Sequence, residues 1–205
     1  MGKLRCRALP FFYAVTGSDE TSSLHGLGKR KAWEAWKFMP EITNVFAKMG
    51  TRVGVKAGAK LTEDDFDLLQ RFFNIAYRKS SPFFEVNLAR QAMFADGVAI
   101  ENCPPSKGAL KQHILRAILL SRKWHKALEL RPELPSPSNW GWNKNKDNIW
   151  VPHWSDDLIV ADALQKLIRC GCKKRCSGNC TCCQYGLPCT PLCKCYLLGC
   201  SKISD

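Results

Sequence analysis

Nine cysteines near the C-terminus have types and spacing that suit metal binding. They follow the pattern C-x-C-x3-C-x3-C-x-C-x6-C-x3-C-x-C-x4-C, in which a C-x-C pair, a spacer and a single cysteine recur. The nine are Cys170, Cys172, Cys176, Cys180, Cys182, Cys189, Cys193, Cys195 and Cys200. Thiolate is a preferred zinc ligand, and a structural zinc takes four ligands in a tetrahedron. The sequence therefore predicts a zinc site in this segment.

The cysteine count also indicates how many ions bind. Three tetrahedral zinc ions need twelve ligand positions, which nine cysteines fill if six bind one ion each and three bridge two ions. Such a cluster carries a net charge of about −3. Lys173, Lys174 and Arg175 lie inside the array, and no acidic residue occurs from Ala163 to Ser204. The sequence thus predicts three zinc ions as the cofactor.

The alternative interpretation is a disulfide framework of the kind found in small secreted proteins. Cysteines one residue apart pair poorly with each other, and the array contains three C-x-C pairs. Outside the array the chain has only Cys6 and Cys103. These features favour zinc and a reducing compartment. Cys183, next to Cys182, is a tenth cysteine that we expect to be a spare or exchange ligand.

The array resembles the tesmin-type CXC domain, which has C-x-C-K-K, a single cysteine, a second C-x-C, a small-residue turn, C-x3-C-x-C and a last cysteine. The matching segments are Cys170-Gly-Cys172-Lys173-Lys174, Cys176, Cys180-Thr-Cys182, Gly186-Leu-Pro-Cys189, Cys193-Lys-Cys195 and Gly199-Cys200. Related modules occur in chromatin and DNA-binding proteins, so the resemblance implies a nuclear location, DNA or another nucleic acid as partner, and chromatin proteins as further partners. The family carries two repeats and a base-reading tyrosine; this chain has one repeat and Asn179 at the tyrosine position. Sequence-specific base reading is therefore not expected.

The overall charge agrees with an anionic partner. The chain of 205 residues has a formal net charge of +13. Nucleic acid is the simplest partner for such a chain, and a basic surface that serves solubility alone is the alternative. The best candidate for a membrane span, the apolar run Ala117 to Leu120, is far too short to cross a bilayer, so no membrane association is expected. Phosphate contacts are expected at Lys173, Lys174, Arg175 and Lys194.

A second motif near the N-terminus suits phosphate binding. It consists of Gly17-Ser-Asp19-x-Thr21 followed by Gly26-x-Gly28-Lys29-Arg30-Lys31-Ala32. Two glycines let the main chain approach a phosphate, and the next helix presents its N-terminal amides to it. The motif resembles the helix-two-turn-helix of the flap-endonuclease class of PIN-like nucleases. That resemblance implies backbone contacts to DNA at Gly26, Gly28, Lys29, Arg30 and Lys31; an ordinary helix start is the alternative.

The nuclease site itself is incomplete in this chain. Such enzymes need several carboxylates around two metal ions, mostly from strands before this motif. None of the eighteen residues before Asp19 is acidic, so Asp19 is expected to be a remnant or a helix cap, and no catalytic residue is assigned. The whole chain, Glu101 to Pro105 and Leu134 to Trp142 included, also resembles the C-terminal half of a group of animal proteins, some linked to mobile elements. It is expected to be a truncated or partial member.

Three functions therefore stand side by side. The first is a zinc-binding, nucleic-acid-binding protein without a complete nuclease site. The second is the remnant of a metal-dependent, structure-specific nuclease, and the third is a zinc-stabilised protein-interaction module.

The remaining sequence predicts a mainly α fold, with a helical body, long loops and a small irregular zinc-cluster domain. The expected helices run from about Lys29 to before Pro40 and over about Glu41–Lys48, Thr62–Tyr77, Phe84–Ala95 and Lys107–Leu128, with a last one after Ser155. Their expected core residues are Phe66, Leu69, Phe73, Ala76, Leu110, Ile114, Ala117 and Ile118. Expected domains are 1–50 (partial PIN-like region), 51–168 (helical body) and 169–202 (CXC-type zinc-binding domain).

Three segments are less regular. Leu9 to Val15 is expected to be a buried run, and Gly50 to Gly58 a link. Pro132 to Asn148 is expected to be a loop. The tryptophans in and after that loop are core anchors or a base-stacking platform; they are Trp140, Trp142, Trp150 and Trp154.

Overall fold

The computed structural model describes most of the chain and divides it into two compact units, Met1–Asp157 and Leu158–Asp205. The described residues are 2–50, 61–155, 169–172, 176, 180–184, 188–190 and 192–195. The predicted link at 51–58, the helix after Ser155, Lys173 to Arg175 and Cys200 lie outside them. The domain boundaries expected from the sequence stay predictions.

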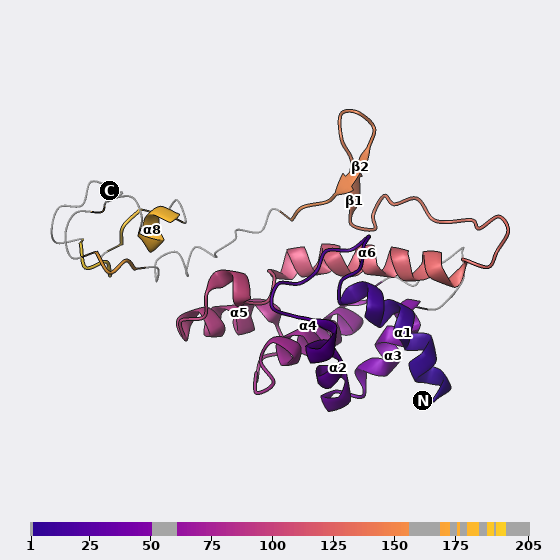
Figure 1. Cartoon of the computed structure of the whole chain (residues 1–205), viewed down its shortest axis with the longest axis horizontal. Helices are drawn as coiled ribbons and strands as arrows, with labels where there is room; N and C mark the ends of the chain where they lie inside the picture. Colours follow the sequence, from indigo (N-terminus) through magenta and orange to yellow (C-terminus); the bar gives the residue numbers. More distant parts are fainter. Residues whose placement is uncertain are drawn as a thin grey trace. The chain divides into compact units, whose positions relative to one another are not determined.

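Helices dominate the first unit, here called the helical body, which confirms the mainly α fold (Figure 1). Its elements are α1 (Lys3–Val15), α2 (Lys29–Phe38), α3 (Ile42–Gly50), α4 (Glu63–Tyr77), α5 (Val86–Ala95), the short η1 (Ile100–Asn102), α6 (Lys107–His125), β1 (Trp142–Lys144) and β2 (Trp150–Pro152). No described helix is long and apolar enough to cross a bilayer.

Polar caps fix the starts of the two longest helices. The Thr62 side chain accepts a hydrogen bond from the Asp65 backbone N–H at 3.2 Å at the start of α4. Ser106 accepts one from the Ala109 N–H at 3.3 Å at the start of α6. Each bond satisfies a backbone donor that the first helical turn leaves unpaired. These caps fix where the buried faces of α4 and α6 begin.

The core lies where α1, α3, α4 and α6 pack together (Figure 1). Phe46 of α3 is fully buried at its centre, with its ring 5.6 Å from that of Phe11, 5.2 Å from that of Trp36 and 5.1 Å from that of Phe72. The predicted core residues are confirmed as buried: Phe66, Leu69, Phe73 and Ala76 on α4, and Leu110, Ile114, Ala117 and Ile118 on α6. Burying such side chains stabilises the body by about 1.5–3 kcal/mol each.

Two parts of the helical body differ from the prediction. The run Leu9 to Val15 is the second half of helix α1, although Pro10 removes one backbone hydrogen bond there. Packing of α1 against α3 and α6 outweighs that loss. Helix α6 ends at His125 instead of Leu128, and its last turn is basic, which suits the negative end of the helix dipole.

The predicted loop from Pro132 to Asn148 contains the first strand of a two-stranded antiparallel hairpin, which corrects the prediction for this segment as well. The Asn145 side chain accepts hydrogen bonds from the backbone N–H groups of Asp147 (3.0 Å) and Ile149 (2.9 Å), and so closes the turn. Gly141 enters the hairpin with φ +79°, and a Cβ there would lie 2.5 Å from the Gln112 carbonyl oxygen. Only glycine fits this close approach to α6.

Candidate metal centre

The cysteines gather in the second unit, around the short helix α8 (Thr181–Gln184). Cys170, Cys182, Cys189, Cys193 and Cys195 are buried. Cys172, Cys176, Cys180 and Cys183 are half-buried. No disulfide joins any pair of the cysteines that the structure describes.

Four of the sulfur atoms form a tetrahedron. The Sγ atom of Cys170 lies 3.8 Å from that of Cys176, 4.0 Å from that of Cys189 and 3.3 Å from that of Cys195. The other three edges are 3.5 Å (Cys176–Cys189), 3.4 Å (Cys176–Cys195) and 3.7 Å (Cys189–Cys195). All six sulfur–sulfur distances of this tetrahedron are therefore short and similar.

These edges fit a metal ion and do not fit disulfides. With zinc–sulfur bonds of about 2.3 Å, the sulfur atoms of a tetrahedral site lie about 3.8 Å apart. A disulfide needs about 2.05 Å and joins sulfurs in exclusive pairs, whereas each of these sulfurs has three near neighbours. The donor set and its geometry are thus compatible with a thiolate-bound metal such as zinc.

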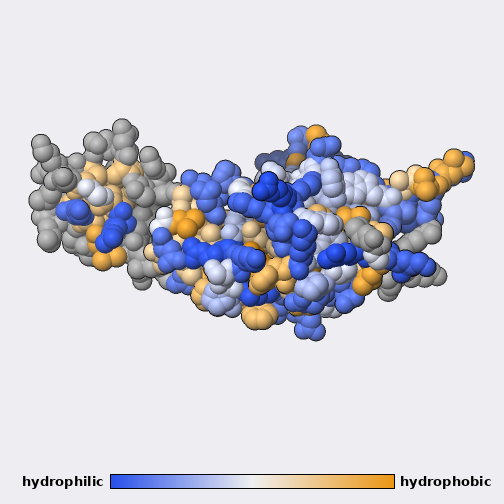
Figure 2. All heavy atoms as spheres, turned by 60° about the horizontal axis from the view of Figure 1, so that its bottom comes forward, coloured by the Kyte–Doolittle hydropathy of each residue, from blue (hydrophilic) through white to orange (hydrophobic). Residues whose placement is uncertain are grey.

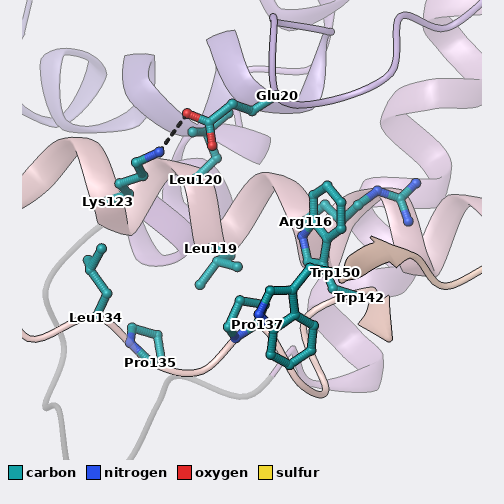
Figure 3. Close-up of a pocket in the computed structure, with 10 residues that line it drawn as sticks. All are labelled: Glu20, Arg116, Leu119, Leu120, Lys123, Leu134, Pro135, Pro137, Trp142 and Trp150. Atoms are coloured by element: carbon teal, nitrogen blue, oxygen red, sulfur yellow. Dashed lines mark hydrogen bonds and ion pairs between the residues drawn. The ribbon is translucent and has the colours of Figure 1, made fainter. Parts of the chain in front are cut away.

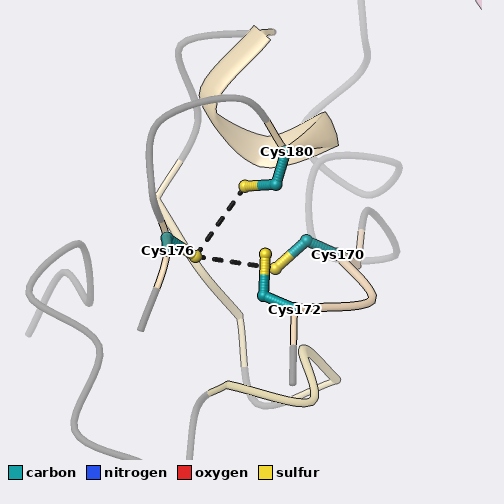
Figure 4. Close-up of side chains that lie close together, drawn as sticks. All are labelled: Cys170, Cys172, Cys176 and Cys180. Atoms are coloured by element: carbon teal, nitrogen blue, oxygen red, sulfur yellow. Dashed lines mark hydrogen bonds between the residues drawn. The ribbon is translucent and has the colours of Figure 1, made fainter. Parts of the chain in front are cut away.

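Two further groups of four sulfurs lie close enough to share an ion. One consists of Cys170, Cys172, Cys176 and Cys180 (Figure 4), and the other of Cys170, Cys182, Cys189 and Cys193. Dashed lines in Figure 4 join the sulfur of Cys176 to that of Cys170, at 3.8 Å, and to that of Cys180, at 3.7 Å. The three groups overlap: Cys170 belongs to all of them, and Cys176 and Cys189 belong to two. Sequence spacing alone did not identify the shared cysteines.

Hydrogen bonds and burial set the protonation of the metal-free thiols. Burial raises the pKa of Cys182 to about 12. Burial also acts to raise the pKa of Cys193, but the backbone N–H of Cys170, 3.4 Å from its Sγ, and Thr190 outweigh that effect and lower the pKa to about 7. Since zinc binds only thiolate, loading these sites at neutral pH must release protons.

The basic residues predicted for the array are only partly described. Lys194 is exposed, and its backbone N–H donates to the Cys170 carbonyl oxygen at 3.3 Å. Its neighbours Cys193 and Cys195 therefore lie inside the unit while its ammonium group faces solvent. Lys173, Lys174, Arg175 and Cys200 fall outside the described residues.

The glycine turn of the helical body lies between α1 and α2. Gly26 and Gly28 are exposed, and Gly28 is the N-cap of α2. Lys29 turns inward: its Nζ donates to the carbonyl oxygens of Tyr13, at 3.2 Å, and Gly17. Burial lowers its pKa. Lys29 thus binds carbonyl oxygens at the end of α1 and just after it.

The other two cations of the turn are placed differently. Arg30 is exposed. Lys31 is exposed too, and its Nζ donates to the Gly26 carbonyl oxygen at 2.9 Å. Two cations and the glycine amides are therefore what this turn presents to solvent.

Asp19 is exposed in the turn after α1. Within the described residues, the groups of His, Cys, Asp or Glu side chains close enough to share an ion consist of cysteines alone. The structure therefore brings Asp19 together with no described set of carboxylates that could form a two-metal site.

An apolar cavity of about 370 Å³ is a feature that sequence reasoning missed (Figure 3). Leu119 lies at its base, with Pro135 and Pro137 on one side and Trp142 and Trp150 on the other. The 2.8 Å ion pair between Lys123 and Glu20 lies at its edge. Trp142 and Trp150 are half-buried walls of this cavity, whereas Trp140 packs on the core and Trp154 is exposed.

The rest of the surface is mostly hydrophilic on the face of the helical body seen in Figure 2. Two apolar side chains just beyond α6, those of Leu128 and Leu130, are almost fully exposed to solvent. Isolated apolar side chains of this kind are common on protein surfaces.

Comparison of the chain with protein-family models, with curated proteins and with solved structures gives no match in any of the three.

Proposed function

We propose that the C-terminal cysteines bind three zinc ions as one cluster. The observation that carries this proposal is the sulfur tetrahedron of Cys170, Cys176, Cys189 and Cys195, whose edges of 3.3–4.0 Å surround the expected spacing of zinc thiolates. The count of nine cysteines supports the number of ions.

The overlap of the sulfur groups supports a specific assignment of ligands. Cys170, Cys176 and Cys189 are shared between groups and would bridge pairs of zinc ions. The first ion would take Cys172 and Cys180 in addition, and the second Cys182 and Cys193. The third would take Cys195 from the sulfur tetrahedron and, because Cys170 already bridges the first two ions, Cys200 in place of Cys170. Each bridge then joins two ions, and the three ions and three bridges close into a ring.

We propose further that this cluster contacts nucleic acid, DNA above all, in the nucleus. The support is the resemblance to the tesmin-type CXC domain and the net charge of +13. Lys194 would bind phosphate from the cluster surface together with Lys173, Lys174 and Arg175. The exposed turn at Gly26, Gly28, Arg30 and Lys31 would form a second phosphate contact. Chromatin proteins would be further partners of the protein.

Binding to duplex DNA over a range of salt concentrations tests the nucleic-acid proposal. Each neutralised phosphate contributes about −0.9 to the slope of log affinity against log salt. Replacing Lys173, Lys174 and Arg175 by alanine should flatten the slope by up to about three units, measured by fluorescence anisotropy.

A triple variant of equal charge provides the control. Lys107, Lys111 and Lys123 are each paired with a glutamate, at 3.5, 3.3 and 2.8 Å, so their replacement by alanine should change the slope little. If the cluster variant binds with unchanged affinity and slope, its charges only balance the thiolates and the nucleic-acid proposal fails.

A zinc-stabilised protein-interaction module is the second candidate. The apolar cavity beside Trp142 and Trp150 favours it, because a hollow lined mainly by apolar side chains suits an apolar group of a partner better than a phosphate. This candidate predicts zinc binding without salt-dependent DNA binding, so the same titration separates the two.

A further inference from the structure

Cys183 lies beside the metal centre without belonging to it. It is absent from the three groups of four sulfurs, although it follows Cys182 directly. Its Sγ lies 3.4 Å from that of Cys180, and the two residues have C-x-x-C spacing across the start of α8. Both side chains are half-buried, so small oxidants can reach them.

Cys180 is one of the ligands whose loss would affect a single ion. It belongs to one sulfur group, in contrast to the shared Cys170, Cys176 and Cys189. Removing its thiolate would leave a single ion with three ligands, two of them bridges. The rest of the cluster would keep its full ligand set.

Other close sulfur pairs are less open to oxidation. The Sγ atoms of Cys170 and Cys195 are 3.3 Å apart, and those of Cys182 and Cys193 are 3.6 Å apart, but all four side chains are buried. Oxidation of a thiol requires access as well as a nearby partner. The Cys180–Cys183 pair combines the two and, unlike the half-buried Cys176–Cys180 pair at 3.7 Å, includes a sulfur outside the three groups.

We propose that Cys183 is an oxidisable thiol that forms a disulfide with Cys180 and thereby releases one zinc ion. This inference rests on the proposed zinc cluster. Closing the bond requires the two sulfurs to move from 3.4 Å to about 2.05 Å apart.

A peroxide supplies the oxidising equivalents. The Cys183 sulfur attacks one peroxide oxygen, the O–O bond breaks, and Cys183 becomes a sulfenic acid while the other oxygen leaves as water. The Cys180 sulfur then leaves zinc and attacks the Cys183 sulfur, which expels the sulfenic oxygen as hydroxide, and a proton converts it to water. The two sulfurs lose two electrons in total, and hydrogen peroxide gains two and forms two water molecules. A dithiol such as dithiothreitol reverses the change by thiol–disulfide exchange.

The test uses the full chain, zinc-loaded and reduced, and stoichiometric hydrogen peroxide. Native mass spectrometry follows the number of zinc ions. After the remaining thiols are blocked, fragmentation of the tryptic peptide 176–194 locates any disulfide. We expect one zinc ion to be lost with a Cys180–Cys183 disulfide, and dithiothreitol with added zinc to restore it.

Cys183→Ser should retain its zinc, with release slowed at least about tenfold because the attacking thiol is missing. Cys6→Ser removes an exposed cysteine outside the array and should behave as the unaltered chain does. Equal zinc release from Cys183→Ser and the unaltered chain, or a disulfide that omits Cys183, would overturn this inference and leave the zinc cluster standing. A reduced chain that binds no zinc would overturn both.

Discussion

Replacing a shared cysteine should cost more zinc than replacing an unshared one. Cys189 and Cys195 form a matched pair, since both are buried and lie in the same sulfur tetrahedron, 3.7 Å apart. Cys189 also belongs to a second group, whereas Cys195 does not. Serine in place of either keeps the side-chain size and removes the thiolate.

The expected magnitude follows from the ligand count. A structural zinc contributes about 10–16 kcal/mol at neutral pH, or about 2.5–4 kcal/mol for each of four thiolates. Cys195→Ser should therefore weaken one zinc by about 100- to 1000-fold. Cys189→Ser should weaken two zinc ions by that factor each, because its sulfur would bridge them.

Competition with a chromogenic zinc chelator measures this directly. Cys195→Ser should give up one zinc ion at a low chelator concentration, and Cys189→Ser two. Cys183→Ser, whose sulfur lies outside the three groups, should match the unaltered chain. Equal loss from all three variants would refute the assignment of shared and unshared ligands.

Three further predictions concern the helical body. Phe46→Ala should destabilise it by about 3–5 kcal/mol in urea unfolding followed by circular dichroism, since its buried ring packs on four other aromatic rings; a chelator should leave this transition unchanged, and a chelator-induced shift would contradict the independence of the two units. Burial lowers the pKa of His113 to about 4 in the folded chain. Between about pH 6.5 and pH 4 the unfolded chain therefore binds a proton that the folded chain does not. The free energy of unfolding should thus fall by up to about 3 kcal/mol as pH drops from about 6.5 towards 4, and it should fall less in His113→Asn. An equal fall in the variant would show that His113 is not the cause. The chain alone should not cleave flap DNA with magnesium, because Asp19 has no described carboxylate partners; cleavage that disappears in Asp19→Asn would promote the nuclease alternative.

Local signals predicted the helices well where a cap and an apolar stripe coincide. Thr62 and Asp65 mark the start of α4, and the stripe that begins at Phe66 is buried as expected. Helix α1 was missed because Pro10 interrupts its pattern, and its stability comes from packing against α3 and α6. The hairpin was missed because its three-residue strands are too short for an alternating pattern.

The candidate site was predictable in composition and not in connectivity. The spacing identified the cysteines that gather in the second unit, since only that segment repeats C-x-C. Which sulfurs are shared depends on contacts between residues far apart in the sequence, such as the hydrogen bond from the Lys194 N–H to the Cys170 carbonyl oxygen. The spacing of the cysteines does not predict these contacts. Lys29 was predicted to contact phosphate, but its Nζ instead donates to the carbonyl oxygens of Tyr13 and Gly17. The sequence did not predict these bonds, because they depend on where α1 ends.

Native mass spectrometry of the full chain, purified under reducing conditions with zinc present, tests the central claim most directly. The account predicts a species carrying three zinc ions and no disulfide, with residues 170–200 losing their structure when a chelator removes the metal. A metal-free chain with its cysteines joined in disulfides would contradict it.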